Sequence, residues 1–314
     1  MKKLAVAFFC LIGFGAFAQQ AVQFTQYYNN RLFYNPGVAG NSGSICLNGT
    51  HRSQWVGFDN APTTQNFNAE IPLKILHGGV GLSITNDQIG FFQDVTASLM
   101  YAYQMELAGG LLGIGVQVDF NSKGLTSGEW ITPDGTLTDI SLANFGENTF
   151  AIDPAFGAYF SHPKFWAGIS VTRLLATQSE LKNTIGSVTQ FMGDRALILM
   201  GGYNYMLPSS NWEFRPSAMI KNSLGSGALQ ADINVNALYN NKVSAGLGYR
   251  LDDAISLMVG YNILPSLRLS YSYDITTSQL STVSSGSHEI YVGYCFKIEI
   301  PPRPKGSYRN PVFL

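Results

Sequence analysis

The chain has 314 residues, of which 46% are hydrophobic, 13% are aromatic and only 12% are charged. A soluble domain carries about 25% charged residues, yet the mean hydropathy of this chain is only +0.06, because uncharged polar residues and 33 Gly replace the charges. This composition excludes a disordered chain, which would be charged and poor in aromatics, and a helical membrane protein, which needs repeated apolar runs of about 20 residues. With 19 Lys and Arg against 20 Asp and Glu, a basic nucleic-acid-binding protein is excluded as well.

Residues 1–18 have the pattern of a cleaved export signal. Lys2 and Lys3 precede an apolar stretch over 4–17, and Ala16-Phe17-Ala18 has the small-x-small form of a signal-peptidase site. Cys10 raises the alternative of a lipoprotein anchor, but it comes too early and lacks small residues before it. Removal of Lys2 and Lys3 changes the formal net charge from −1 to −3, a balance that predicts no polyanionic partner.

The remaining chain alternates apolar and polar residues with the period of a β-strand, and no segment shows a sustained helical period. Most of the predicted strands have 9–13 residues, whereas soluble strands have about 5–6 and tilted membrane-crossing strands need about 9–11. In chain order they are 44–53, 64–73, 78–86, 94–107, 111–121, 153–161, 165–173, 194–206, 212–221, 228–239, 242–250, 254–263, 266–276 and 287–299.

The links between these strands differ in length on alternate sides. Links after even-numbered strands are short, whereas all the long links, 54–63, 122–152, 174–193 and 277–286, follow odd-numbered strands. Short periplasmic turns, long extracellular loops and an even strand count are typical of outer-membrane barrels. The sequence therefore predicts an all-β fold, an antiparallel transmembrane β-barrel of about 14 strands over 44–300, with both termini periplasmic. The alternative, a soluble β-sandwich, gives no reason for links of different length to separate in this way.

The alternation also predicts which side chains face lipid and which face the lumen. Tyr and Trp near strand ends are expected in the interfacial girdles, although each could instead be an ordinary core residue: Tyr101, Tyr103, Trp166, Tyr203, Tyr205 and Trp212. The polar face should line the lumen and comprises Asn48, Arg52, Glu70, Glu106, Asp119, Glu213, Arg215, Asp232, Arg268, Asp274, Glu289 and Lys297.

The two ends do not continue the strand pattern. Residues 19–43 are polar, aromatic and irregular, so this segment is expected either inside the lumen or across the periplasmic mouth. Residues 301–314 contain Pro301, Pro302 and Pro304, which cannot extend a sheet. This periplasmic tail ends in Phe313 and Leu314 and is interpreted as a docking segment, with a disordered stub as the alternative.

No pattern indicates catalysis. The four His residues are scattered without zinc-binding spacing, and no GxSxG, P-loop or GxGxxG motif occurs. We therefore expect no enzymatic activity, no cofactor and no metal. An outer-membrane hydrolase with catalytic groups from distant strands is the alternative, which nothing in the spacing supports.

Two cysteines remain after removal of the signal. Cys46 lies on the first predicted strand and Cys295 on the last, which are neighbours in a closed barrel, and both share the polar parity. They could form a disulfide across the closure seam, which an exported protein permits. Two unpaired lumenal residues is the alternative, and it is the favoured one because the sequence does not set the strand register.

Four segments resemble a known family: QFTQYYNNRLFYNPGVAG at 23–40, RSQWVGFDNAPTTQNFNAEIPL at 52–73, GVGLSITNDQIG at 79–90 and RNPVFL at 309–314. They are similar to the PorP/SprF family of type IX secretion system outer-membrane proteins from Bacteroidota, over essentially the whole chain after the signal. The family's tail commonly has Arg where Val312 stands here, so a charge-dependent role of the tail does not carry over. The matching residues are Gln26, Tyr27, Asn35, Pro36, Ala39, Gly40, Arg52, Gln54, Trp55, Gly57, Phe58, Pro62 and Thr64.

The resemblance implies an integral outer-membrane barrel without enzymatic activity that supports secretion or cell-surface attachment of type IX cargo. Such cargo carries a C-terminal sorting domain and is typically a large adhesin in gliding bacteria, and some members bind periplasmic components of the machinery. The runner-up function is a porin or a channel for hydrophobic solutes.

The links 122–152, 174–193 and 277–286 would be the cargo-facing surface, with the alternative that they merely vary as loops do. Aromatic candidates for partner binding there are Trp130, Phe145 and Phe191, together with Phe313 and Leu314 in the tail. In the first outward hairpin, Trp55 and Phe58 are expected to be packed, and Arg52 is expected to pair with a lumenal carboxylate.

Overall fold

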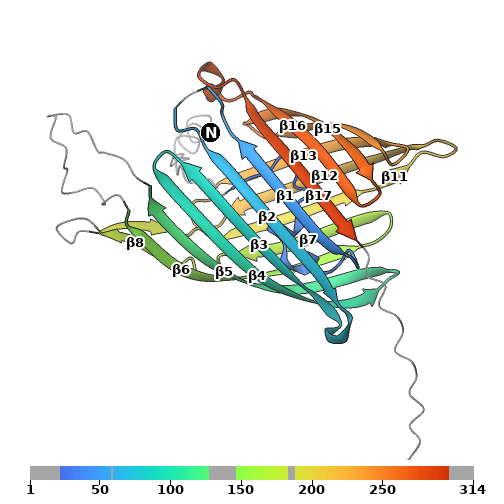
Figure 1. The fold of residues 1–314 in the computed structure, drawn as a ribbon, viewed down its shortest axis with the longest axis horizontal. Helices are drawn as coiled ribbons and strands as arrows, with labels where there is room; N and C mark the ends of the chain where they lie inside the picture. Colours follow the sequence, from blue (N-terminus) through green and yellow to red (C-terminus); the bar gives the residue numbers. More distant parts are fainter. Residues whose placement is uncertain (1–21, 58, 127–145, 183–187, 297–314) are drawn as a thin grey trace, which may run out of the picture.

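The computed structural model describes residues 22–57, 59–126, 146–182 and 188–296, which form a closed antiparallel β-barrel (Figure 1). The barrel has 14 strands, since the two-residue β11 continues β10 along the same edge of β12. The strands are β1 (Ile45–Ser53), β2 (Thr63–Leu73), β3 (Gly78–Ile89), β4 (Phe92–Leu107), β5 (Gly110–Leu125), β6 (Asn148–Ser161), β7 (Phe165–Thr172), β10 (Ala196–Tyr203), β11 (Tyr205–Met206), β12 (Trp212–Ser223), β13 (Leu229–Tyr239), β14 (Val243–Arg250), β15 (Ala254–Leu264), β16 (Leu267–Thr276) and β17 (Ser287–Phe296).

Each strand pairs with its neighbours in the chain, and the ring closes where β1 pairs with β17. This seam runs in continuous register from Ile45 opposite Phe296 to Ser53 opposite His288. β10 pairs with both β7 and β12, so the long link between β7 and β10 does not interrupt the ring. Among the described residues, closure leaves no edge of the barrel sheet unpaired, which is the condition for a β-structure to cross a membrane.

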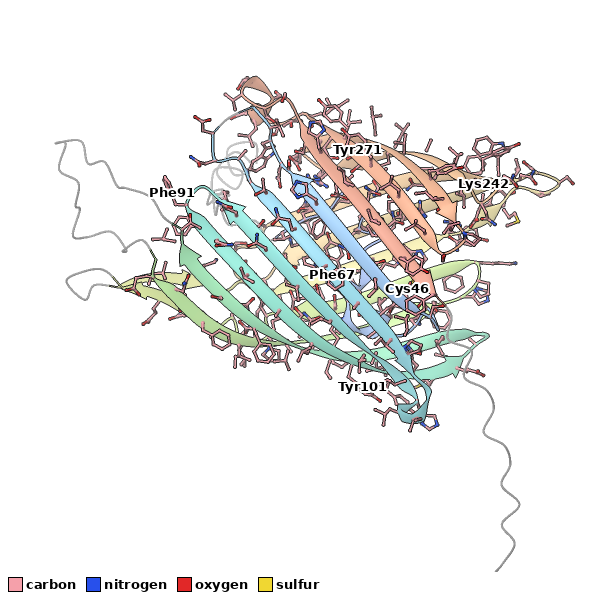
Figure 2. All side chains as sticks on the ribbon, viewed as in Figure 1. Cys46, Phe67, Phe91, Tyr101, Lys242 and Tyr271 are labelled. Carbon is pink, nitrogen blue, oxygen red and sulfur yellow. A yellow bond between two sulfur atoms is a disulfide. The ribbon has the colours of Figure 1, made fainter. Side chains whose placement is uncertain are left out.

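The predicted alternation of faces is observed in the barrel wall. In β15, Ile255, Leu257 and Val259 are exposed on the outer surface while Ser256 and Met258 between them are buried. Figure 2 shows side chains covering the outside of the wall, Phe67 of β2 among them. The low charge content thus follows from the outer face, where every second strand residue is apolar.

The links separate by length as predicted. Short turns at 74–77, 108–109, 162–164, 207–211, 240–242 and 265–266 lie at one end, which we call the turn mouth. The longer links, which follow β1, β5, β7 and β16, leave the barrel at the other end, which we call the loop mouth. Among the described residues, no helix is long and apolar enough to cross a membrane.

Four details of the sequence analysis need correction. The predicted loop 174–193 contains a hairpin, β8 (Gln178–Lys182) paired with β9 (Val188–Met192), and β6 begins at Asn148 inside the predicted loop 122–152. Backbone hydrogen bonds between strands need no apolar side chains. The β8–β9 hairpin and the first residues of β6 can therefore form where the sequence does not alternate. Trp166 is buried inside the barrel rather than in an interfacial girdle, and Glu106 is exposed near the turn mouth.

Residues 22–43, which we call the plug, fold into the lumen, one of the two predicted places. The plug contains the short helix α2 (Arg31–Tyr34) and the 3₁₀ turn η1 (Pro36–Val38), and it leads into β1 at the turn mouth. Its first described residue, Val22, lines a cavity with Arg173 and Asp194 of the loop mouth. The barrel strands therefore begin and end at the turn mouth, but the described chain starts near the opposite mouth.

Candidate functional site

The plug fills the lumen with an apolar core of its own. Phe24, Tyr27, Leu32 and Tyr34 are almost completely buried, and they pack against wall residues of β4, β6, β7, β10 and β12 in one cluster. Large aromatic side chains bury about 150–250 Å² each, so this contact is a major source of the plug's stability. The irregular polar and aromatic composition of 22–43 therefore belongs to a packed element.

The Asn35-Pro36-Gly37 turn lies directly on the backbone of the wall, because the wall is made of glycine there. A Cβ atom on Gly115 would lie 2.3 Å from the carbonyl carbon of Pro36, and one on Gly113 would lie 2.1 Å from the carbonyl oxygen of Gly37. A Cβ on Gly157 would lie 2.3 Å from Oδ1 of Asn35. We call Gly113, Gly115 and Gly157 the glycine seat, since any side chain at these positions would displace the turn.

Asn35 joins this turn to two neighbouring strands by hydrogen bonds. Its Nδ2 donates to the carbonyl oxygens of Ala158 in β6 and Ile169 in β7, each at 3.0 Å. Its Oδ1 accepts from the backbone N–H of Gly37 at 2.8 Å and closes the turn. The side chain is fully buried, so loss of these bonds would leave several buried polar groups unpaired.

Gly40, which lies between η1 and β1, has a left-handed backbone conformation with φ of +71°. Its N–H donates to Oε2 of the buried Glu70 at 3.0 Å. Its Cα lies so close to β3 that a Cβ atom on Gly79 would be 2.4 Å from it. Glycine is required at position 40 for both its conformation and its close approach to β3.

Near the loop mouth, a carboxylate of β17 binds the plug's backbone. The N–H groups of Thr25 and Gln26 donate to the two oxygens of Glu289 at 2.7 and 2.9 Å. The Thr25 hydroxyl donates to Asp274 at 2.7 Å and accepts from Arg52 at 2.8 Å. One plug residue therefore contacts β1, β16 and β17, the three strands around the seam.

Arg52 pairs with lumenal carboxylates, as predicted. Its guanidinium lies 2.8 Å from Asp274 and 3.2 Å from Glu289, and all three side chains are at most 2% exposed. Arg250 shares Asp274 with Arg52, at 3.3 Å, and lies 2.8 Å from Asp232. Buried charges persist only when paired and hydrogen-bonded, so this charge cluster depends on both arginines.

The cysteines at the seam face each other. Cys46 and Cys295 are partners in the β1–β17 register, their Cα atoms are 4.1 Å apart and their sulfur atoms are bonded. The structure thus has the seam disulfide, not the favoured alternative of two free thiols. It holds the seam near the turn mouth, where Figure 2 labels Cys46, while Arg52 holds the same seam near the loop mouth.

The first hairpin loop is joined to the loop before β17. The N–H of Val56 donates to the carbonyl oxygen of Gly286 at 2.8 Å, and the N–H of Ser285 donates to the carbonyl oxygen of Val56 at 2.6 Å. Trp55 is half-buried and its N–H donates to the Ser287 hydroxyl at 3.0 Å. The segments 54–62 and 277–286 therefore form one surface, which we call the loop crown.

A cavity of about 100 Å³ remains between the plug and the wall at the loop mouth. Val22 and Phe33 line it together with Gln117, Asp119 and Lys221. At its rim, Asp194 accepts from the backbone N–H groups of Gly225 and Ser226. Burial acts to raise the pKa of Asp194, but these donors outweigh it and lower the pKa below its usual value.

Of the remaining residues singled out in the sequence, some make defined contacts and others lie outside the described residues. Thr64 donates to Asp87 at 2.6 Å, the Pro62 carbonyl accepts from Gln54, and Gly57 lies against Val283. Five candidates fall outside the described residues: Phe58, Trp130, Phe145, Phe313 and Leu314. Lys297 also lies outside them, and Phe191 lies in β9 without a described side chain.

Sequence reasoning missed Thr25, Arg250 and the glycine seat. Arg250 has the polar parity of its strand, and Gly113 and Gly115 alternate with apolar residues in β5. Strand parity could therefore have indicated Arg250, Gly113 and Gly115 as lumenal. Among the described residues, no group of three or more His, Cys, Asp and Glu side chains is arranged to hold a metal ion.

Comparison with known proteins gives one family match, the Type IX secretion system membrane protein PorP/SprF family, over residues 16–294. No curated protein matches the sequence. Among solved structures, the toluene transporter TodX of P. putida is similar at 10% identity and a TM-score of 0.47, over 84% of this chain and 92% of that one. Omp33 of Acinetobacter baumannii is similar at 10% identity and a TM-score of 0.45, over 81% and 99%.

Proposed function

Since the chain belongs to the PorP/SprF family of type IX secretion system membrane proteins, we propose that this outer-membrane barrel attaches an exported protein to the cell surface. The partner is a large cargo protein with a C-terminal sorting domain, such as an adhesin. The barrel acts by binding and positioning, without catalysis or a cofactor.

The observation that carries this proposal is the occupied lumen. A solute channel needs an open path, but here the plug is packed against the wall through the glycine seat and the charge cluster. The plug is continuous with β1, so it belongs to the barrel. A wall built around a fixed internal element favours a rigid platform over a porin or a hydrophobic-solute channel.

The order of the loop crown also supports this proposal, because the loop crown is the surface that would contact the cargo. Its two loops come from opposite ends of the chain and hold each other through backbone hydrogen bonds. Val283 is 55% exposed on it, and the segment 277–286 carries no charge. An ordered, partly apolar surface costs little conformational entropy on binding. We propose that the loop mouth faces outward and the turn mouth faces the periplasm.

A photo-crosslinking amino acid at position 283 tests this proposal in native outer membranes, with the same amino acid at position 242 in the turn mouth as the control. We expect a covalent adduct with a large exported protein from position 283 only. An adduct with that protein from position 242 and none from 283 would contradict the proposed orientation. Failure of any exported protein to co-purify would remove the proposed function.

A further inference from the structure

Three arginines face the lumen in the half of the barrel near the turn mouth. Arg31 belongs to the plug, Arg215 to β12 and Arg268 to β16, and each is half-buried. The charges of Arg31 and Arg215 both act on the guanidinium of Arg268, so the three side chains lie within electrostatic range of one another. Like charges at this range destabilise each other unless anions compensate them. We call these three residues the arginine cluster.

The acids of the described chain compensate the arginine cluster only in part. Glu213 lies 2.8 Å from Arg215 and pairs with it. Glu70 interacts electrostatically with Arg31, but its carboxylate accepts a backbone N–H of the plug, and Glu106 is exposed at the end of β4. Within the described ranges, the other two arginines form no ion pair, whereas both arginines of the charge cluster pair with at least two carboxylates.

Neutral groups hold the guanidinium of Arg31 in place. Its Nε donates to the carbonyl oxygen of Tyr28 at 2.7 Å, and its Nη1 donates to the hydroxyl of Tyr159 at 2.6 Å. The guanidinium also lies over the ring of Trp166, 4.4 Å from the centroid. These contacts fix the position of the charge without neutralising it, and among the described residues Nη2 has no acceptor.

Arg268 is less engaged than Arg31. Its Nη2 donates to the hydroxyl of Ser244 on β14 at 3.3 Å, and its Nε is buried without a hydrogen-bond partner in the described part of the chain. A guanidinium has five N–H donors and matches a carboxylate or phosphate through two parallel hydrogen bonds. Because an unpaired buried donor is unfavourable, Arg268 and Arg31 together offer the donors that recognise an oxyanion.

We propose that Arg31 and Arg268 bind an oxyanion, the carboxylate or phosphate group of a soluble ligand that enters through the turn mouth. The ligand connects the plug with β16 in this half of the barrel, where the glycine seat fixes the plug to β5 and β6 alone. Arg215 adds positive potential, but Glu213 occupies its guanidinium. This site lies away from the loop crown and does not depend on the proposed function.

The test uses the fluorescence of Trp166 as a local reporter, since its ring lies under the guanidinium of Arg31. The chain has four tryptophans, so Trp55→Phe/Trp130→Phe/Trp212→Phe leaves Trp166 alone. The full-length protein in uncharged detergent micelles is titrated separately with inorganic phosphate and with acetate. We expect a saturable change with at least one of them, and the tighter of the two identifies the oxyanion.

Arg268→Gln in the same background should bind that anion about tenfold more weakly, because a charged hydrogen-bond pair is lost. Arg268→Lys keeps the charge without the planar donors and should bind about threefold more weakly. Arg173→Gln is the matched control, a half-buried arginine that lines the cavity at the loop mouth, and it should bind as the parent does. Bound anion should also slow limited proteolysis of the plug in the parent, but not in Arg268→Gln.

The absence of a saturable change with either anion would overturn the proposal, and so would equal affinities of Arg268→Gln and the parent. A response to added phosphatidylglycerol alone would also overturn it, because the anion would then come from lipid rather than through the turn mouth. No exported protein takes part in these measurements. Their failure therefore leaves the crosslinking result at position 283 standing, and the reverse also holds.

Discussion

At the scale of single residues, Arg52 connects the seam, the charge cluster and the plug. It lies on β1 directly opposite Glu289 of β17, and it reaches Asp274 of β16 and the Thr25 hydroxyl of the plug. Removal of one partner from a buried ion pair is costly because it leaves buried charge without full compensation. The plug and the seam therefore depend on the same side chain.

Arg52→Ala should lower the free energy of unfolding by about 3–5 kcal/mol, because it leaves Glu289 buried without its counter-ion and leaves Asp274 with Arg250 alone. Lys123→Ala is the matched control, since Lys123 pairs with Asp94 at 3.4 Å while about a quarter of each side chain is exposed. That pair should contribute less than about 1 kcal/mol. Urea unfolding followed by tryptophan fluorescence measures both, and equal losses would contradict the role of Arg52.

Arg52 also shows how far single residues could be predicted. Its parity and charge indicated a lumenal carboxylate partner, and the structure has two. The choice of Asp274 and Glu289, and the part of Thr25, depended on strand register and on where the plug lies. Neither is encoded in local alternation, because shifting a strand pair by two residues preserves every face.

At the scale of elements, the strands followed from the sequence more completely than the plug. Alternation defined all the barrel strands to within a few residues, since each apolar face must meet lipid. The plug has no period, so its composition allowed two places, and the glycine seat decides between them. The β8–β9 hairpin was missed because its residues need not alternate outside the membrane.

The glycine seat predicts a strong effect from a single methyl group. Gly115→Ala would place a Cβ 2.3 Å from Pro36, so the plug must shift, at a cost of about 1–3 kcal/mol. Gly49→Ala is the control, because a Cβ there meets nothing within 4 Å. Limited proteolysis should cleave the plug faster in Gly115→Ala than in Gly49→Ala. Identical cleavage rates would show that the close contact does not hold the plug.

The seam disulfide links residues separated by 249 positions, so it constrains a very long loop in the unfolded chain. Replacing Cys46 and Cys295 together by Ser should lower the free energy of unfolding by about 2–5 kcal/mol. Reductant should have the same effect on the natural protein and none on the double variant. An intact mass for two free thiols in unreduced protein would contradict the disulfide.

At the scale of the whole molecule, the barrel differs between its two mouths. The loop mouth carries the ordered loop crown and links that contain Asp and Glu, whereas the short turns of the turn mouth contain lysines and no Asp or Glu. Between them the plug runs from a charge cluster near one mouth to the glycine seat near the other. This arrangement suits a rigid barrel whose lumen is held by a fixed internal element.

Single-channel recording in planar bilayers tests the occupied lumen most directly. The purified natural protein should give no steady large conductance, because the plug fills the barrel, whereas a variant lacking residues 22–43 should conduct if the barrel still closes. Gel migration of unheated samples checks that both barrels are folded. Steady large channels from the natural protein would contradict the account and favour a solute channel.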